Sequence, residues 1–510
     1  MRRYFMVLIT SVLVSASAHA VTADVSHFHA PQYDGSGKLI SWHIDTDGPF
    51  HYIMDLQAKW WLKAPIVNGW PVYLTAAELG RNYDQRNGAV PGSTCSMAIL
   101  ACLKYYAYTG NADYLNLAMT TGNYILQQCL TPVTCKAYPR FPWPVGRTGD
   151  IHPDGSGHPN CRAGEIMPDK GAMIGFALLR LYEATGTQAY LDEAIHIANV
   201  LADNAVQGDA LQSPWPFRCL ANEGTMVDGK ISGNQIFALR LYDELLRIGK
   251  TGNGKYPATR NNVWNWLRNV AIADDSGSKW QGFFEDHSGD EDNPTQICAL
   301  ETARYLLEQK EALDPDWFSM TGRIIKTVKD KWTVHSGSYT AIGEQTKDMT
   351  PYNSHTARFA SILAMYYNAG ADKVYKDEAY HSFCYAAYSV DKDGFADTYF
   401  GSNIAWTSDS FGDWMLHFID GFAAVPEWAP DKNNHLLLST SVLKYISYNA
   451  DKIEYITFDD RGSEKLKLCF IPVVVNVNNK PITSWTWNSV EHVLQIDRTS
   501  GSKIQVLNNK

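Results

Sequence analysis

Carboxylates stand at several points where the chain could cleave a glycosidic bond. Asp169 precedes a strongly apolar stretch, 172–181, and Asp409 and Asp413 lie four residues apart at the start of the segment 413–423. Glycoside hydrolysis needs two carboxyl groups across a pocket, one protonated as acid and one ionised as base or nucleophile. We therefore predict that Asp169 is the acid/base and that Asp409 or Asp413 is its partner. The alternative is a helix N-cap for Asp169, and a cap or a surface charge for the other two.

A second chemistry is encoded in the segment from Tyr352 to Arg358. β-Elimination on a uronate needs a neutralised carboxylate, a base and an acid for the leaving oxygen. Asn353 and Arg358 would hold the carboxylate, His355 would be the base and Tyr352 the acid. Because His355 and Arg358 are three residues apart, both could face a cavity from the first turn of a helix. The alternative is an ordinary helix N-terminus with a hydrogen-bonded histidine.

Other polar and aromatic residues precede the apolar segments and are predicted to bind substrate. The polar ones are Lys170, Asn234, Gln235 and Gln296, and the aromatic ones include Trp143, Trp215 and Trp406. Exposed aromatic faces in a polar cleft can stack on the C–H face of a sugar ring. The alternative for the aromatic residues is loop packing.

We predict no metal site and no cofactor. The acidic loop 285–292 could hold Ca²⁺, but its spacing departs from the EF-hand pattern, and a solvated acidic loop is the favoured interpretation. His152, His158 and Cys161 match metal-ligand spacing only loosely and lie beside glycines that indicate a plain loop.

A repeated helix hairpin must position these residues. Four glycines that we expect to end helices follow apolar segments, and we call them glycine stops: Gly110, Gly186, Gly252 and Gly370. They are separated by 76, 66 and 118 residues, and the last interval corresponds to two hairpin repeats. The segments before each stop are apolar nearly all round and those after it are amphipathic, which indicates buried inner helices covered by outer ones.

Five such hairpins run from 94 to 390, and 413–423 can pair with either 51–62 or 75–83 to make a sixth. The predicted fold is therefore mainly α, an (α/α)6 barrel, with a solenoid as the alternative. In such a barrel all inner helices run the same way. The loops that enter them, with the residues above, then share one face and rim a central pocket, where helix N-termini favour anionic ligands.

The ends of the chain differ from the barrel. Residues 1–20 have the basic start, the apolar run and the Ala18-His19-Ala20 ending of a secretory signal, which predicts a periplasmic or secreted protein. We expect the barrel over 21–431 and, over 432–510, a small antiparallel β domain built from short alternating runs. A net charge of −10 argues against nucleic-acid binding, and no segment predicts membrane insertion.

Nine cysteines in an exported chain predict some disulfides. Cys129 and Cys135 bracket a short loop and are the simplest local pair. Cys161 with Cys219 is a second candidate.

The hairpins resemble the six-hairpin glycosidase superfamily, over roughly residues 50–430. Pro168-Asp169-Lys170 with the stop at Thr185-Gly186 looks like the segment of unsaturated glucuronyl hydrolases in which an Asp precedes an inner helix. The superfamily also includes rhamnogalacturonyl hydrolases and barrel-type β-glucuronidases, and the same toroid serves uronate lyases and glucuronyl epimerases. The resemblance implies a general acid/base role for Asp169, but Lys170-Gly171 departs from the residues that follow the Asp in that family.

The expected function is therefore that of a secreted enzyme that degrades an acidic, uronate-containing glycan, favoured as a glycoside hydrolase. A polysaccharide lyase built on His355 and Tyr352 is the closest alternative. A non-catalytic glycan-binding toroid is the second alternative.

Overall fold

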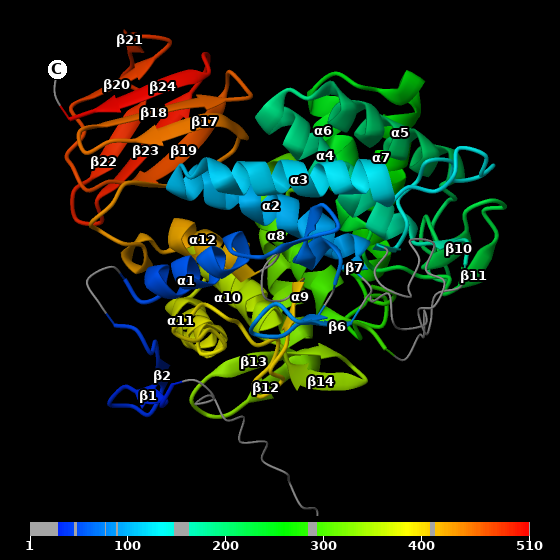
Figure 1. Ribbon diagram of the computed structural model, residues 1–510, viewed down its shortest axis with the longest axis horizontal. Coiled ribbons are helices and arrows are strands. Elements are labelled where there is room, and N and C mark those ends of the chain that lie inside the picture. The colour runs from blue at the N-terminus through cyan, green and yellow to red at the C-terminus, as the bar shows by residue number, and fades with distance from the viewer. Residues whose placement is uncertain are drawn as a thin grey trace, which may run out of the picture.

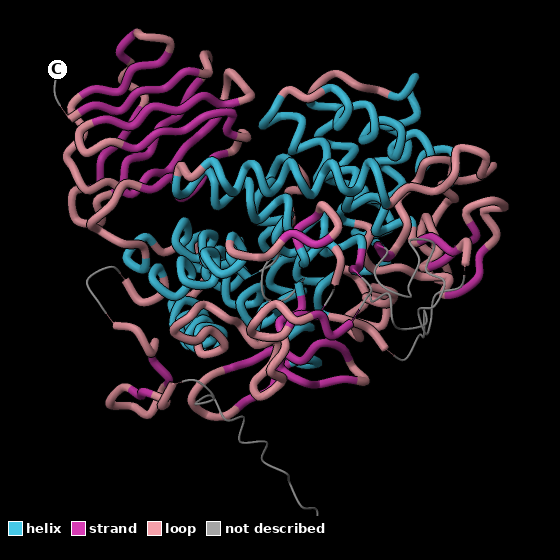
Figure 2. The backbone as a smooth tube through the Cα atoms, in the orientation of Figure 1, coloured by secondary structure: helices cyan, strands magenta, loops and turns pink. Residues whose placement is uncertain are grey.

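The computed structural model describes residues 29–44, 48–76, 78–87, 90–146, 163–283, 293–407 and 414–508. Within these ranges the helices gather in one body, which their contacts show to be a ring, and the carboxyl-terminal strands form a separate stack at one side of it (Figures 1 and 2). The predicted leader and the acidic loop 285–292 lie outside the described residues.

The ring consists of alternating inner and outer helices. The inner helices are α2 (Gly92–Thr109), α4 (Pro168–Thr185), α6 (Ile236–Arg247), α8 (Gln296–Gln309), α10 (Asn353–Asn368) and α12 (Trp414–Ala424). The outer helices are α1 (His51–Leu62), α3 (Ala112–Gln128), α5 (Gln188–Asn204), α7 (Lys255–Trp266), α9 (Trp317–Trp332) and α11 (Lys373–Ala387). Each inner helix packs on the next, and α12 packs on α2, so the ring closes. The predicted (α/α)6 barrel is confirmed, and the solenoid alternative is wrong.

Burial explains the alternation seen in the sequence. In α4, 15 of 18 residues are buried, whereas in its outer partner α5 only 8 of 17 are. A helix enclosed on all sides must be apolar all round, and a helix that covers it needs one apolar stripe.

The glycine stops behave as predicted at two of three early positions. Gly110 and Gly186 follow α2 and α4 directly with φ of +74° and +71°, a conformation in which a Cβ would be strained. The third stop is displaced, because α6 ends at Arg247 and Gly249 supplies the left-handed residue, while Gly252 begins a short 3₁₀ turn. The sixth outer helix is α1. The segment 75–83 instead contributes strand β5 (Glu78–Leu79), which pairs with β15 (Ala405–Trp406).

The carboxyl-terminal strands form two packed sheets, where the sequence predicted a single small sheet. One contains β16 (His435–Ser439), β19 (Gly462–Lys467), β23 (Val493–Arg498) and β22 (Trp485–Asn488), and the other contains β17 (Leu443–Tyr448), β18 (Lys452–Thr457), β24 (Lys503–Leu507), β20 (Val474–Val477) and β21 (Lys480–Pro481). Strand β16 was missed, because its three consecutive leucines do not alternate with polar residues.

The β-sandwich closes the carboxyl-terminal ends of inner helices. The Tyr448 hydroxyl donates to the Ala107 carbonyl at 2.6 Å, and His435 Nδ1 donates to the Tyr108 carbonyl at 2.9 Å. Lys465 Nζ donates to the Ala423 carbonyl at 2.8 Å. The last carbonyls of a helix have no partner within the helix, so side chains from the sandwich satisfy them.

The predicted local disulfide is not formed. Cys129 and Cys135 are both free thiols, as is Cys219, while Cys161 lies outside the described residues. Cys129 is buried at the end of α3, where its carbonyl accepts from the Trp143 amide, whereas Cys135 sits in a turn that begins at Pro132. The two thiols therefore belong to different environments. None of the described helices is long and apolar enough to cross a membrane.

His435 makes the barrel–sandwich contact sensitive to acid. Burial and the nearby His51 lower its pKa from 6.5 to about 3. Below pH 6.5 the unfolded chain therefore binds a proton that the folded chain does not, and stability falls as the pH falls from 6.5 towards 3. We expect this group to cost about 2 kcal/mol between pH 7 and pH 5. Urea unfolding of the wild type and of His435→Asn, which keeps a hydrogen-bond donor, measures this loss of unfolding free energy. The variant should lose less stability between pH 7 and pH 5. Equal losses would show that His435 is not the group responsible.

Candidate active site

Asp169 lies in the first turn of α4 and contacts the entrance of the next inner helix. Asn234 Nδ2 donates to Asp169 Oδ2 at 3.2 Å, and Lys170 Nζ lies 3.3 Å from the same oxygen. The carboxyl group is buried, and burial raises its pKa above the usual range even though Lys170 and Asn234 lower it. A buried carboxyl with a raised pKa is suited to hold a proton and donate it.

The N-cap interpretation of Asp169 is not supported. The residue that caps α4 is Met167, and no side chain makes a cap hydrogen bond there. Asp169 is instead directed to Lys170 and Asn234. The unusual Gly171 has a packing reason, because a Cβ at this position would collide with the ring of Phe141.

Lys170 is the counter-ion of Asp169. Its side chain is fully buried, and Nζ lies 3.3 Å from the centroid of the Phe283 ring, a cation–π contact. The sequence predicted an open rim cation that would bind substrate. In the structure the ammonium group is already shared between Asp169 and Phe283, so any substrate contact requires Lys170 to exchange partners.

The amides at the inner-helix entrances use their N–H groups within the protein. Asn353 Nδ2 donates to the carbonyls of Asp397 and Thr398 at 2.6 and 3.0 Å, and Gln235 Nε2 donates to the Ser232 carbonyl at 2.9 Å. Gln296 Nε2 lies 3.4 Å from the Glu344 carbonyl. These bonds hold the segments that lead into α6, α10 and α12.

The same entrances carry buried acceptor oxygens without hydrogen-bond donors. No described residue donates to any member of this set, which comprises Asp169 Oδ1, Asn234 Oδ1, Gln235 Oε1, Gln296 Oε1 and Asn353 Oδ1. They lie at the amino-terminal ends of four consecutive inner helices, α4 to α10. A buried acceptor that lacks a donor costs free energy, so such a set is suited to a ligand that brings donors.

The residues of the lyase hypothesis are close together, but two of them have structural partners. Tyr352 is buried, with its ring 5.5 Å from that of His355 and 5.4 Å from that of Tyr399. Arg358 Nε donates to Glu301 Oε1 at 3.0 Å, deep inside the ring. Because Arg358 is held by Glu301 and the Asn353 N–H groups are used by a loop, neither is poised to hold a substrate carboxylate.

The three tryptophans differ in their placement. Trp215 is 1 % exposed and donates to the Leu201 carbonyl at 3.0 Å, so it packs the structure and presents no face to a sugar. Trp143 is also buried, against the start of α2. Trp406 is half-buried beside Tyr352, with ring centroids 5.7 Å apart, and its buried indole N–H donates to no described residue. Of the three, Trp406 stays a substrate-binding prediction with structural support.

Several predicted residues lie outside the described ranges. They are Asp409 and Asp413, the acidic loop 285–292, and His152, His158 and Cys161. Within the described ranges, no group of three or more His, Cys, Asp and Glu side chains could hold a metal ion.

Sequence reasoning missed a network of buried charges below the entrances. Glu301 Oε1 accepts a hydrogen bond from Arg358 Nε at 3.0 Å and lies 3.3 Å from Arg304 Nε. Arg304 also forms an ion pair with Asp420. Burial alone would raise the pKa of Glu301, but Arg304, Arg358 and Arg240 lower it to about 2.

The same network holds a neutral histidine. Burial and then Arg304 lower the pKa of His417 well below its usual range, and its Nδ1 accepts from Arg304 Nη2 at 2.7 Å. The sequence signal was present in charged residues, such as Glu301 and Arg304, inside the otherwise apolar α8.

Comparison with known proteins identifies the fold. No family model matches the chain, and no curated protein matches it. Among solved structures, it is similar to a cellobiose 2-epimerase from Bacillus thermoamylovorans, with a TM-score of 0.53 and 12 % identity over 72 % of this chain and 98 % of the other. A D-mannose isomerase has a TM-score of 0.54 and 12 % identity, over 75 % of this chain and 100 % of the other. A GH76 α-mannanase of Bacteroides thetaiotaomicron has a TM-score of 0.50 and 10 % identity, over 74 % of this chain and 96 % of the other.

These likenesses show the six-hairpin (α/α)6 toroid. The fold that the sequence resemblance implied is thereby confirmed. At identities of 10 to 12 % they assign no residue of this chain a role.

The buried network should be far more sensitive to substitution than a surface ion pair. Arg304→Met leaves Glu301 and Asp420 with less positive charge in a buried site, and we expect a loss of about 3–5 kcal/mol in the free energy of unfolding. Arg323→Ala is the control, because Arg323 and Asp275 are 51 % and 78 % exposed at 3.4 Å, and should cost less than about 1 kcal/mol. Equal losses in chemical denaturation would show that the network contributes no special stability.

Proposed function

We propose that this protein is a carbohydrate-active enzyme, a glycoside hydrolase in which Asp169 is the proton donor. The observation that carries the proposal is the set of five buried acceptor oxygens, one of them on Asp169 itself, that have no donor among the described residues. Sugar hydroxyl groups are donors and could satisfy these acceptors. The fold is shared with an epimerase and an isomerase of sugars and with a mannanase, which supports a saccharide substrate.

The environment of Asp169 supports the role of acid. Burial raises its pKa, Asn234 fixes the orientation of one oxygen, and the other oxygen receives no donor from the residues that the structure describes. A protonated carboxyl in this position could donate to the oxygen of a glycosidic bond. The second carboxylate remains a prediction, with Asp409 and Asp413 as the candidates.

A uronate-containing substrate remains the predicted class, and Lys170 provides a physical reason for it. Lys170 is the cation that lowers the pKa of Asp169. A substrate carboxylate that drew Lys170 away would raise the pKa of Asp169 further and keep the acid protonated at the moment it is needed. Export to the periplasm or the medium likewise remains a prediction.

Elimination is the less favoured chemistry. His355 and Tyr352 are adjacent, as a base and an acid would have to be, but Arg358 and Asn353 are engaged elsewhere. Incubation with a panel of uronate and neutral polysaccharides distinguishes the possibilities. New reducing ends without ultraviolet absorbance indicate hydrolysis, absorbance of unsaturated uronates indicates elimination, and a changed sugar configuration by NMR without either indicates epimerisation. Binding without any product would contradict an enzymatic role.

Asp169→Asn should reduce kcat/KM by about 10²- to 10⁴-fold, because it removes general acid catalysis and leaves the fold intact. Asp192→Asn, an exposed carboxylate on the outer helix of the same hairpin, should leave activity unchanged. Full activity in Asp169→Asn would remove the assignment.

The pH profile gives a second test of Asp169. Its pKa is raised, so activity should be present below that pKa and fall as the pH rises through it, at a higher pH than an ordinary Asp would give. Lys170→Met removes the counter-ion and should shift this fall to still higher pH. A rise in KM with an unshifted profile would instead assign Lys170 to substrate binding alone.

A further inference from the structure

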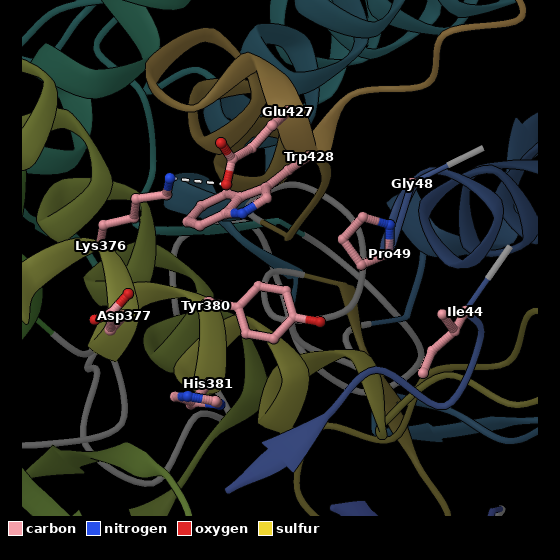
Figure 3. Close-up of a pocket in the computed structure, with 9 residues that line it drawn as sticks. All are labelled: Ile44, Gly48, Pro49, Lys376, Asp377, Tyr380, His381, Glu427 and Trp428. Carbon is pink, nitrogen blue, oxygen red and sulfur yellow. Dashed lines mark ion pairs between the residues drawn. The ribbon is translucent and has the colours of Figure 1, made fainter. Parts of the chain in front are cut away.

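A pocket of about 410 Å³ lies outside the candidate active site (Figure 3). It lies between the start of α11, the 3₁₀ helix Pro426–Trp428 and the amino-terminal arm, which is the segment before α1 that contributes Ile44, Gly48 and Pro49. Its volume falls within the range of small-molecule sites. Its position is on the opposite face of the ring from Asp169. The 3₁₀ helix follows the carboxyl-terminal end of α12, whereas Asp169 marks the amino-terminal end of an inner helix, and inner helices of 11 to 18 residues separate the two faces by roughly 20 Å.

The pocket has an aromatic centre. Figure 3 shows Tyr380 in the middle, with Trp428 above it and Pro49 and Ile44 to one side. The rings of Tyr380 and Trp428 are 5.9 Å apart, and Phe50 packs behind both at 5.6 and 6.2 Å. Tyr380 is half-buried and Trp428 is 5 % exposed, so the accessible ring face belongs to Tyr380, with Trp428 supporting it.

Polar groups surround that ring. Lys376 Nζ and Glu427 Oε1 form an ion pair at 2.7 Å, and Asp377 adds an exposed carboxylate. His381 Nδ1 is bonded to the Leu39 carbonyl at 2.7 Å, which fixes the ring and leaves Nε2 as a further polar atom at the pocket.

The backbone closes one wall in a way that requires glycine. Gly48 has φ of +80°, and a Cβ there would collide with the carbonyl group of Trp428. The arm therefore passes too close to the 3₁₀ helix for a side chain at this position, and this contact holds one wall of the pocket in place without a ligand.

An aromatic face ringed by carboxylates, an amine and an imidazole suits a polyhydroxylated ring. The C–H face of a pyranose packs on Tyr380, and carboxylates accept from neighbouring sugar hydroxyls. The Lys376–Glu427 pair is neutral and Asp377 adds a negative charge, which disfavours a uronate. We propose that this pocket is a second saccharide-binding site, selective for neutral sugar residues, on the face of the ring opposite the candidate active site. It rests on the proposed function only for the expectation that glycans are the partner.

Hydrogen–deuterium exchange of the full chain tests the proposal. The Asp169→Asn variant serves as background so that turnover does not consume the probes, which are cellohexaose, mannohexaose, xylohexaose and, as the acidic comparison, hexagalacturonate. We expect at least one neutral probe to protect peptides covering 373–381 and 426–429 in a saturable way, and hexagalacturonate to protect them about tenfold more weakly or not at all.

Variants show whether the protection comes from this pocket. Asp377→Ala with Glu427→Gln should weaken the protective binding by about tenfold or more, since each removes a charged acceptor. Lys373→Ala, an exposed change on the same helix that does not line the pocket, is the matched control and should bind as before. The melting temperature of each variant, measured by circular dichroism, confirms that it is folded.

Three results would overturn the proposal. They are no protection by any neutral probe, undiminished protection in the double variant, or equal protection by hexagalacturonate. Failure of the proposed function is distinguishable, because it would appear as absence of product from the wild-type protein while protection at 373–381 persists.

Discussion

The pairing of charges at the centre of the ring constrains every other part of the structure. Glu301, Arg304, Arg358 and Asp420 come from three inner helices and are almost entirely removed from water. Each would be strongly destabilising if its partners were absent, so α8, α10 and α12 can pack only in the rotation and height that bring these groups together. The burial of apolar surface provides the driving force for closing the ring. The charges select one closed arrangement among the several that apolar packing alone would allow.

This arrangement also determines which polar atoms are available at the entrances. Arg358 donates to Glu301, and the amide N–H groups of Asn353 and Gln235 donate to the backbone carbonyls of Asp397 and Ser232. Among the described residues, the open polar atoms of the rim are mainly acceptors, and they include one carboxyl, Asp169, whose counter-ion is itself buried. A rim whose open groups are mostly acceptors is suited to a ligand that brings hydroxyl groups. The ion pairs inside the ring thus help to determine which polar groups are available at the helix entrances.

The ring could be predicted from the sequence because its signals are local. Apolar periodicity marks inner and outer helices, and Gly186 ends α4 where the Thr-Gly stop placed it. The roles of site residues depend on partners distant in sequence, and there the prediction was less successful. Nothing near Asn353 indicates that its amide serves residues 397 and 398, and nothing near Trp215 indicates that it donates to Leu201. The sequence does contain a signal for the buried charge network, namely charged residues within apolar helices such as Glu301 and Arg304, but it was not interpreted in this way.

The direction of the inner helices gives the ring two chemically different faces. Amino-terminal ends present N–H groups and the entrance residues, while carboxyl-terminal ends present carbonyls that need donors. The β-sandwich supplies those donors through Tyr448, His435 and Lys465, and so covers the carbonyl-rich ends of α2 and α12. Because the sandwich lies on that face, it leaves the entrance face to the loops that precede the inner helices. Its attachment therefore stabilises the ring without competing with the candidate site for the same surface.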